Sequence, residues 1–171
     1  MSALCFTGHR PESLPFGENE LSAECLRLKA ILLDEIMRRA EQGYDTFYCG
    51  AARGMDIIFG HQVLLVKALE HPEIKLVCVI PYEEQAKGWP EKWRDRYFGL
   101  LEQADDVVLL SNRYTCDCYQ RRNRYMVDHS DAVLAVYNES GQGGTACTVA
   151  YAGRQGKEVV CINPNTLVRT G

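Results

Sequence analysis

The sequence predicts an α/β protein with a Rossmann-like open parallel sheet of about six strands and helices on both faces. Short apolar runs alternate along the chain with longer segments of helical periodicity. Most of these runs are apolar at consecutive positions, as parallel strands covered on both faces require. The chain of 171 residues has the length of one domain, so we expect a single domain over residues 1–171.

The predicted strands and helices alternate from one end of the chain to the other. Strands are expected at the apolar runs 3–6, 46–49, 76–80, 107–110, 132–136 and 159–162. Helices are expected at 21–42, 54–69, 90–104, 117–129 and 145–155. This order implies right-handed crossovers, so the long loops that follow strands gather at the carboxyl edge of the sheet. Open α/β sheets bind their ligands at that edge.

Local signals support the individual helices. The first helix has one apolar stripe at 4-3-4-4 spacing, made of Leu21, Cys25, Leu28, Leu32 and Ile36. Gly43 then ends this helix. Pro90 suits the first turn of the third helix, and Gly156 ends the fifth.

The charge and the cysteine content restrict the class of protein. With 23 acidic and 19 basic residues the net charge is −4, which excludes a generally basic nucleic-acid coat but leaves room for a local basic patch. Eight cysteines would indicate disulfides in a small secreted chain. The first residues carry no secretory signal pattern, and no apolar run approaches the ~20 residues that span a bilayer. We therefore expect a cytoplasmic protein with reduced thiols and no membrane partner.

The spacing of the cysteines and histidines argues against a metal site. Cys116 and Cys118 lack the second ligand pair of a zinc site, and the four histidines show no ligand spacing. We expect neither a metal nor a resident cofactor.

The first candidate binding motif is Thr7-Gly8-His9-Arg10, directly after the first predicted strand. Gly8 allows a tight turn and a close backbone approach. Arg10 has the planar fork of donors that suits a phosphate or carboxylate, and the alternative is a plain turn with a solvated arginine.

A second motif follows the second predicted strand and opens a helix. Its small residues Gly50 and Gly54 permit tight packing, and free amides at a helix start attract anions. Arg53 adds a formal positive charge, so we expect it to contact phosphate. Asp56 either accepts ribose hydroxyls, acts as a general base, or only interacts favourably with the helix dipole.

A third motif follows the fifth predicted strand. Gly143 and Gly144 can expose backbone N–H groups at the start of the last helix, and Thr145 can cap that helix or bind an oxygen. Thr148 lies one turn further on. One glycine-rich loop is weak evidence alone, whereas three glycine-containing turns at one sheet edge favour binding.

Two further segments are candidates. Arg121, Arg122 and Arg124 lie on the fourth predicted helix and form either a solvated face or a track for an anion or a polynucleotide. Gln85 and Trp89 follow the third strand and could contact a base.

Together these motifs resemble the YpsA-like family, a branch of the SLOG superfamily of Rossmann-like proteins typified by DprA and the LOG phosphoribohydrolases. The resemblance runs from about Leu4 to Pro164 and is carried by five segments: Thr7–Pro11, Gly50–Asp56, Pro81–Trp89, Arg122–Asp128 and Gly143–Ala152. It implies a Rossmann-like sheet and, by superfamily analogy, a nucleotide, nucleotide-sugar or ADP-ribose type of ligand.

One departure from the LOG pattern bears on catalysis. The last loop of LOG-type enzymes resembles P-G-G-x-G-T-x-x-E, with a catalytic glutamate, and Thr148 holds that position here. A hydroxyl cannot act as a carboxylate base near neutral pH. A replacement carboxylate would have to come from elsewhere in the chain, and the candidates are Asp56, Glu83, Asp131 and Glu139.

The sequence therefore predicts a module that binds or senses a phosphorylated nucleotide-like small molecule. The alternatives are hydrolysis of an N-glycosidic or phosphoribosyl bond, as in LOG enzymes, and DprA-like binding of single-stranded DNA, which we rank last because the chain is acidic. The fold is compatible with a homo-oligomer.

Overall fold

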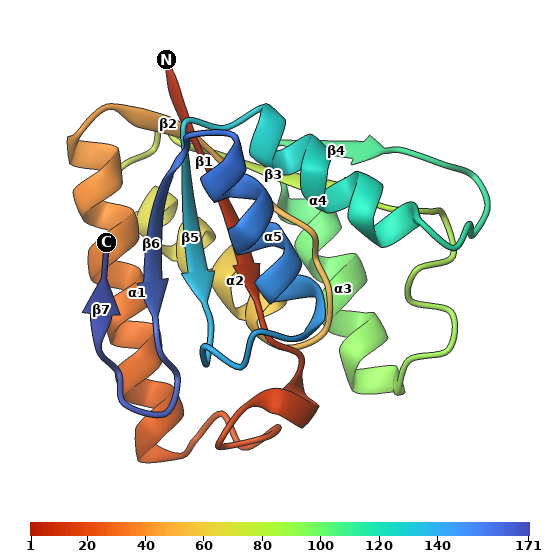
Figure 1. Cartoon of the computed structure of the whole chain (residues 1–171), viewed down its shortest axis with the longest axis horizontal. Coiled ribbons are helices and arrows are strands. Elements are labelled where there is room, and N and C mark those ends of the chain that lie inside the picture. The colour runs from red at the N-terminus through yellow and green to blue at the C-terminus, as the bar shows by residue number, and fades with distance from the viewer.

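The computed structural model describes residues 1–171 as a seven-stranded sheet in the order β4-β3-β2-β1-β5-β6-β7 (Figure 1). The strands are β1 Ser2–Gly8, β2 Tyr44–Cys49, β3 Lys75–Ile80, β4 Asp106–Leu109, β5 Ala132–Val136, β6 Glu158–Ile162 and β7 Arg169–Thr170. The helices are α1 Ala23–Glu41, α2 Met55–Leu69, α3 Glu91–Gln103, α4 Cys118–Asp128 and α5 Gly143–Arg154, with a 3-10 turn at Pro11–Ser13.

The predicted fold class is confirmed. Strands β1 to β6 are parallel, and they and the five α-helices correspond to the predicted elements. The prediction missed β7, which pairs antiparallel with β6. Two residues are too few to show a strand pattern. In addition to its pairing with β6, β7 contacts α1, where Arg169 Nε donates to Glu35 at 3.0 Å.

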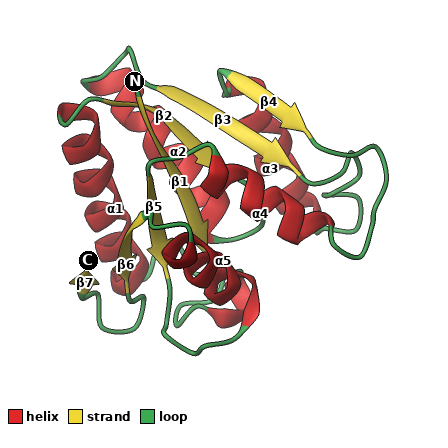
Figure 2. Cartoon of the chain, turned by 45° about the horizontal axis from the view of Figure 1, so that its top comes forward, coloured by secondary structure: helices red, strands yellow, loops and turns green.

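Helices cover both faces of the sheet (Figures 1 and 2). Helices α1, α2 and α3 contribute to the larger apolar core on one face, where Leu32, Phe59 and Trp93 are buried. Helices α4 and α5 cover the other face with a smaller core that includes Met126 and Ala152. Burial on both sides explains why the central strands are apolar at consecutive positions.

The strand order places a topological switch point between β1 and β5. The chain from β1 to β4 builds one side of the sheet, and β5 and β6 then build the other side next to β1. At the carboxyl end Gly8 pairs with Val136. The loops after these two strands diverge to opposite faces, which leaves a crevice between them.

Two glycines let α2 start directly against the loop after β1. A Cβ on Gly8 would lie 2.7 Å from Met55 Cβ, and a Cβ on Gly54 would lie 2.8 Å from the His9 carbonyl oxygen. Gly54 also has a φ of 90°, in the left-handed region that favours glycine. The Met55 N–H donates to His9 O at 3.2 Å, so the second and first motifs are joined through the backbone.

All eight cysteines are unpaired thiols. Cys5, Cys49 and Cys78 are buried in the first three strands, and the Cys49 and Cys78 sulfurs lie 3.9 Å apart without a bond. Burial raises the pKa of the Cys5 thiol to about 12, so this group behaves as a small apolar side chain. In addition, none of the helices is both long and apolar enough to cross a membrane.

We predict that Gly8→Ala destabilises the fold by about 1–3 kcal/mol, because the added methyl overlaps Met55 and the Phe6 ring. Urea unfolding measures the change. The matched control is Gly99→Ala in α3, where a Cβ meets nothing within 4 Å and helix propensity favours alanine by up to ~1 kcal/mol. Equal effects of the two substitutions would contradict the close approach of β1 and α2.

Candidate functional site

A cleft of about 710 Å³ opens at the switch point, within the size range of small-molecule sites. Its walls come from the end of β1 and the loop after it, the start of α2, the inner side of α4 and the loop that leads from β5 into α5. The lining residues include Thr7, Gly8, His9, Arg10, Asp56, Tyr119, Arg122, Asn123, Asn138, Gly143, Gly144 and Thr145. The structure thus brings parts of all three predicted glycine-bearing motifs to one site.

The amino terminus of α5 opens into this cleft. No side chain caps it, and Gly143 has a φ of 89° that turns the chain into the helix. The amides of Gly143, Gly144 and Thr145 precede the hydrogen-bonded turns of α5 and are available to an acceptor. With the helix dipole behind them, these donors form a site for an anion.

The Thr148 hydroxyl forms a hydrogen bond within α5. Its Oγ1 donates to the Gly144 carbonyl oxygen at 2.9 Å, and its side chain lies beside the cleft, in a neighbouring pocket. The position that carries a glutamate in LOG-type loops therefore holds a hydroxyl with a helical acceptor.

His9 joins the two loops that frame the cleft. Its Nε2 accepts the backbone N–H of Asn138 at 3.0 Å, which bridges the loop after β1 to the loop after β5. Burial lowers the pKa of His9. A neutral imidazole is the form that can accept at Nε2, so the bridge is compatible with neutral pH.

The floor of the cleft is a buried guanidinium. Arg122 is only 5% exposed, and its Nη1 donates to the Gly50 carbonyl oxygen at 2.7 Å and to that of Val79 at 3.5 Å. Its Nε donates to Asn123 Oδ1 at 2.8 Å. The side chain therefore runs from α4 to the carboxyl ends of β2 and β3, where it donates to backbone carbonyl oxygens.

Gly50 makes room for this arrangement. A Cβ at this position would lie 2.1 Å from Arg122 Nη1 and 2.8 Å from Asp56 Oδ2. Gly50 itself does not line the cleft but lies beneath it, against Arg122 and Asp56.

Asp56 is the buried carboxyl group of the cleft. It is 5% exposed, and Oδ2 accepts the Ala52 N–H at 3.3 Å. Burial raises the pKa of Asp56, while the positive charge of Arg122 opposes that shift. Burial likewise lowers the pKa of Arg122, and Asp56 opposes it. The two charges compensate each other in a site that excludes most water.

Arg10 and Tyr119 form the mouth of the cleft. Arg10 is exposed and has no carboxylate partner, and its guanidinium carbon lies 5.4 Å from the centre of the Tyr119 ring. Tyr82 packs edge-on against Tyr119 at 6.2 Å and supports the ring.

Sequence reasoning missed Tyr119 and Arg122 as cleft residues. Cys118, Arg122 and Met126 share a buried helical stripe at four-residue spacing, which is the signal that could have shown which face of α4 turns inward.

Besides Gly50, Gly54 and Thr148, three further predicted contact residues lie outside the cleft walls. Arg53 donates to Glu12 Oε1 at 2.9 Å, so its charge is already paired. Gln85 is buried and donates to Gly50 O at 3.3 Å. Trp89 packs edge-on against Tyr97 at 5.4 Å. Gln85 and Trp89 pack inward from the segment after β3, whereas Arg53 lies partly exposed beside Glu12.

Of the four candidate carboxylates, only Asp56 lines the cleft. Asp131 accepts the Ala3 N–H at 2.8 Å near the opposite edge of the sheet. Glu83 lines a shallow pocket beside α3. Glu139 lies in the loop after β5 with a φ of 59°, and its neighbours Asn138 and Ser140 line the cleft instead.

The fold and the cleft together define a Rossmann-like α/β protein with a ligand-sized site at its switch point. Within this class, the model of the YspA SLOG family matches residues 4–167. The chain belongs to this family, which confirms the resemblance carried by the motifs.

Named relatives and solved structures agree with this placement. The UPF0398 proteins of Bacillus thuringiensis (strain Al Hakam) and Bacillus cereus (strain AH187) are each 28% identical over 160 residues, which cover 92% of this chain and 85% of theirs. The X-ray structure of TM1055 has a TM-score of 0.57 at 18% identity and covers 93% of this chain and 72% of that one.

A second solved structure has the same fold. DNA processing protein A from Helicobacter pylori, described for its single-stranded DNA binding mode, has a TM-score of 0.63 at 16% identity. The match covers 95% of this chain and 65% of that one. At such identities the likeness shows the fold alone.

In this chain, Arg122 is buried, whereas Arg121 and Arg124 are exposed, so the three arginines do not form one continuous track.

We predict that Arg122→Gln lowers the free energy of unfolding by about 3 kcal/mol, because Asp56 and the Gly50 carbonyl lose their buried positive partner. Denaturant unfolding measures this change. The control Arg121→Gln, on the exposed side of α4, should change it by less than about 0.5 kcal/mol. A loss below about 1 kcal/mol for Arg122→Gln would show that the guanidinium does not hold the cleft floor.

Proposed function

We propose that the protein binds or senses a phosphorylated nucleotide-like small molecule in the switch-point cleft. The observation that carries this proposal is the uncapped amino terminus of α5, which faces the same cleft as the unpaired side chain of Arg10. Backbone amides, a helix dipole and a free guanidinium converging on one space favour a phosphate group.

The rest of the cleft suits the body of a nucleotide. The half-buried Tyr119 ring offers a flat face for a base at the mouth. Asp56 supplies a carboxylate oxygen toward ribose hydroxyls, and Thr7 and Thr145 add polar side chains. A largely polar lining with one aromatic wall favours a sugar phosphate carrying a base over an apolar molecule.

Substitutions of Arg10 and Arg53 test whether the phosphate lies near Arg10 or near Arg53 at the start of α2. We predict that Arg10→Gln weakens binding of adenosine 5′-monophosphate by about tenfold in calorimetry, since one charge-assisted contact is lost. Arg53→Gln should leave the affinity within about twofold, because Arg53 pairs with Glu12. Both variants should unfold at nearly the wild-type temperature. The opposite ranking would move the phosphate toward the start of α2.

A panel of nucleotides shows which base the binding experiment should use. Thermal shift against the four nucleoside monophosphates identifies the base to be used, because a ligand of the folded state raises the apparent stability. A panel without any shift at millimolar concentration would overturn the proposal.

A second candidate function is cleavage of an N-glycosidic bond, favoured by the raised pKa of the buried Asp56 carboxyl in the cleft. Such a reaction needs a carboxylate that activates water or stabilises an oxocarbenium-like centre.

We predict that nucleoside monophosphates, NAD and ADP-ribose are bound without release of base, because the LOG-type glutamate is replaced by Thr148. Chromatography of the incubated mixtures measures free base. Release by the wild type that disappears in Asp56→Asn, while Asp131→Asn keeps it, would establish the hydrolase instead.

A further inference from the structure

The loop between β5 and α5 is joined to the β1 side of the cleft through one histidine. Just beyond the paired ends of β1 and β5, the Asn138 N–H donates to His9 Nε2 at 3.0 Å. The other hydrogen bonds of residues 138–141 stay within residues 137–142. His9 is therefore the hydrogen-bond partner that fixes this loop to the opposite wall of the cleft.

This loop leads directly into the start of α5. It ends at Gln142, and the uncapped amino terminus of the helix begins with Gly143. Residues 139–144 are exposed, and Glu139 has a φ of 59°. An exposed segment with few partners opens at low free-energy cost. The position of the loop at the cleft therefore depends on whether His9 can accept a hydrogen bond.

The hydrogen bond at His9 exists in one protonation state of the ring only. A neutral imidazole has one nitrogen that accepts, whereas a protonated imidazole has two donors and no acceptor. The partner here is a backbone N–H, which cannot accept in return. A proton on Nε2 would place two N–H donors 3.0 Å apart, so protonation breaks the bridge between the loops.

The charges around His9 give a protonated ring no partner. The ionisable groups that line the cleft or lie on its two loops are Arg10, Glu12, Asp56, Tyr119, Arg122, Tyr137 and Glu139. Glu12 pairs with Arg53, and Asp56 compensates Arg122. His9 forms no ion pair, whereas His71 lies 2.9 Å from Glu73. Because burial lowers the pKa of His9, protonation occurs on the acid side of the usual histidine value of ~6.5.

We propose that His9 is a positioning residue with a pH-sensitive hydrogen bond: the neutral ring holds the loop before α5 at the cleft, and the protonated ring releases it. The consequence for ligand binding rests on the proposed function. A simple charge effect has the opposite sign, because a positive charge on His9 attracts an anion more strongly. Loss of anion affinity on acidification therefore distinguishes release of the loop from added charge.

NMR spectra recorded during a pH titration test the switch without a ligand. We expect the Asn138 amide signal to shift with the same midpoint as the His9 ring signal, below about pH 6.5. In His9→Gln the side-chain oxygen accepts at any pH, so the Asn138 signal should stay close to its position at neutral pH.

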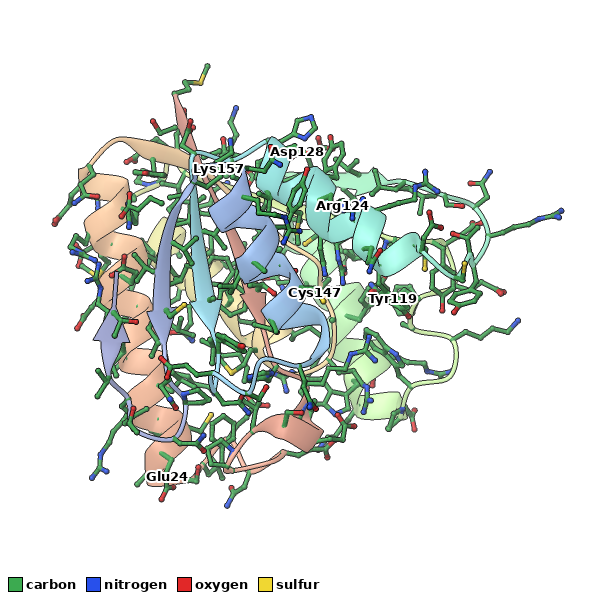
Figure 3. The ribbon with its side chains drawn as sticks, in the orientation of Figure 1. Glu24, Tyr119, Arg124, Asp128, Cys147 and Lys157 are labelled. Atoms are coloured by element: carbon green, nitrogen blue, oxygen red, sulfur yellow. The ribbon has the colours of Figure 1, made fainter.

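The matched control for this titration is His129→Gln. His129 is exposed at the end of α4. Its neighbour Asp128 lies at the opposite edge of the molecule from the loop between β5 and α5 (Figures 1 and 3). Loss of this ring should leave the titration of Asn138 unchanged.

Calorimetry with ADP-ribose tests the consequence for binding, because its phosphates keep the same charge over the range of about pH 5–8 in which histidine titrates. We predict that the affinity of the wild type falls about tenfold between about pH 7.5 and about pH 5. His9→Gln should bind within about twofold over this range, and His129→Gln should behave as the wild type. His9→Ala, which has no acceptor, should bind weakly at both values.

The outcomes separate this inference from the proposed function. An Asn138 signal that does not follow the His9 ring would overturn the switch, whatever the ligand does. A loss of affinity that persists in His9→Gln would assign the pH dependence to another group, such as Asp56, and overturn the role of His9. If Asn138 follows His9 but ADP-ribose binds at no pH, the proposed function fails and the hydrogen-bond switch stands.

Discussion

The cleft depends on one buried contact, the Arg122 guanidinium against the Gly50 carbonyl oxygen at 2.7 Å. Through this contact α4, on one face of the sheet, is joined to the turn that starts α2 on the other face. A charge buried at 5% exposure persists only with compensation, and Asp56 and the carbonyl groups of Gly50 and Val79 supply it. The same side chain thus fixes the floor of the site and orders the loops around it.

Three glycines allow close contacts of the backbone around and below the cleft. Gly50 leaves room for the guanidinium, and Gly8 and Gly54 bring the loop after β1 against the start of α2. His9 then connects that loop to Asn138 across the switch point. The amino terminus of α5 is the part of the rim without a protein partner. The protein is therefore closely packed beneath the cleft and has free donors at its edge, which is the arrangement that pre-organises a site for an anion.

The fold could be predicted from sequence because its signals are local and repeated. Consecutive apolar residues mark the buried strands, and four-residue spacing marks α1. The gathering of the three glycine-bearing motifs also followed from sequence, since carboxyl ends of parallel strands share one edge. Strand β7 could not be predicted, because two residues are too few to show a strand pattern.

The direction of individual side chains was harder to predict than their position along the chain. Arg53 and Arg122 both carry a positive charge near a glycine, yet Arg53 pairs with Glu12 and Arg122 turns beneath the cleft. Gln85 and Trp89 follow a strand at the right edge but pack inward. Burial and pairing of such groups depend on tertiary neighbours, which a single sequence does not show.

We propose that the start of α5 holds a phosphate of a nucleotide in the cleft. Amide NMR spectra recorded during titration with a nucleoside monophosphate test it most directly. We expect saturable shifts for the amides of Gly143, Gly144 and Thr145, together with those of Gly8 and Arg10, while the amide signals of α1 do not shift. Saturation at other amides with these five unmoved would contradict it.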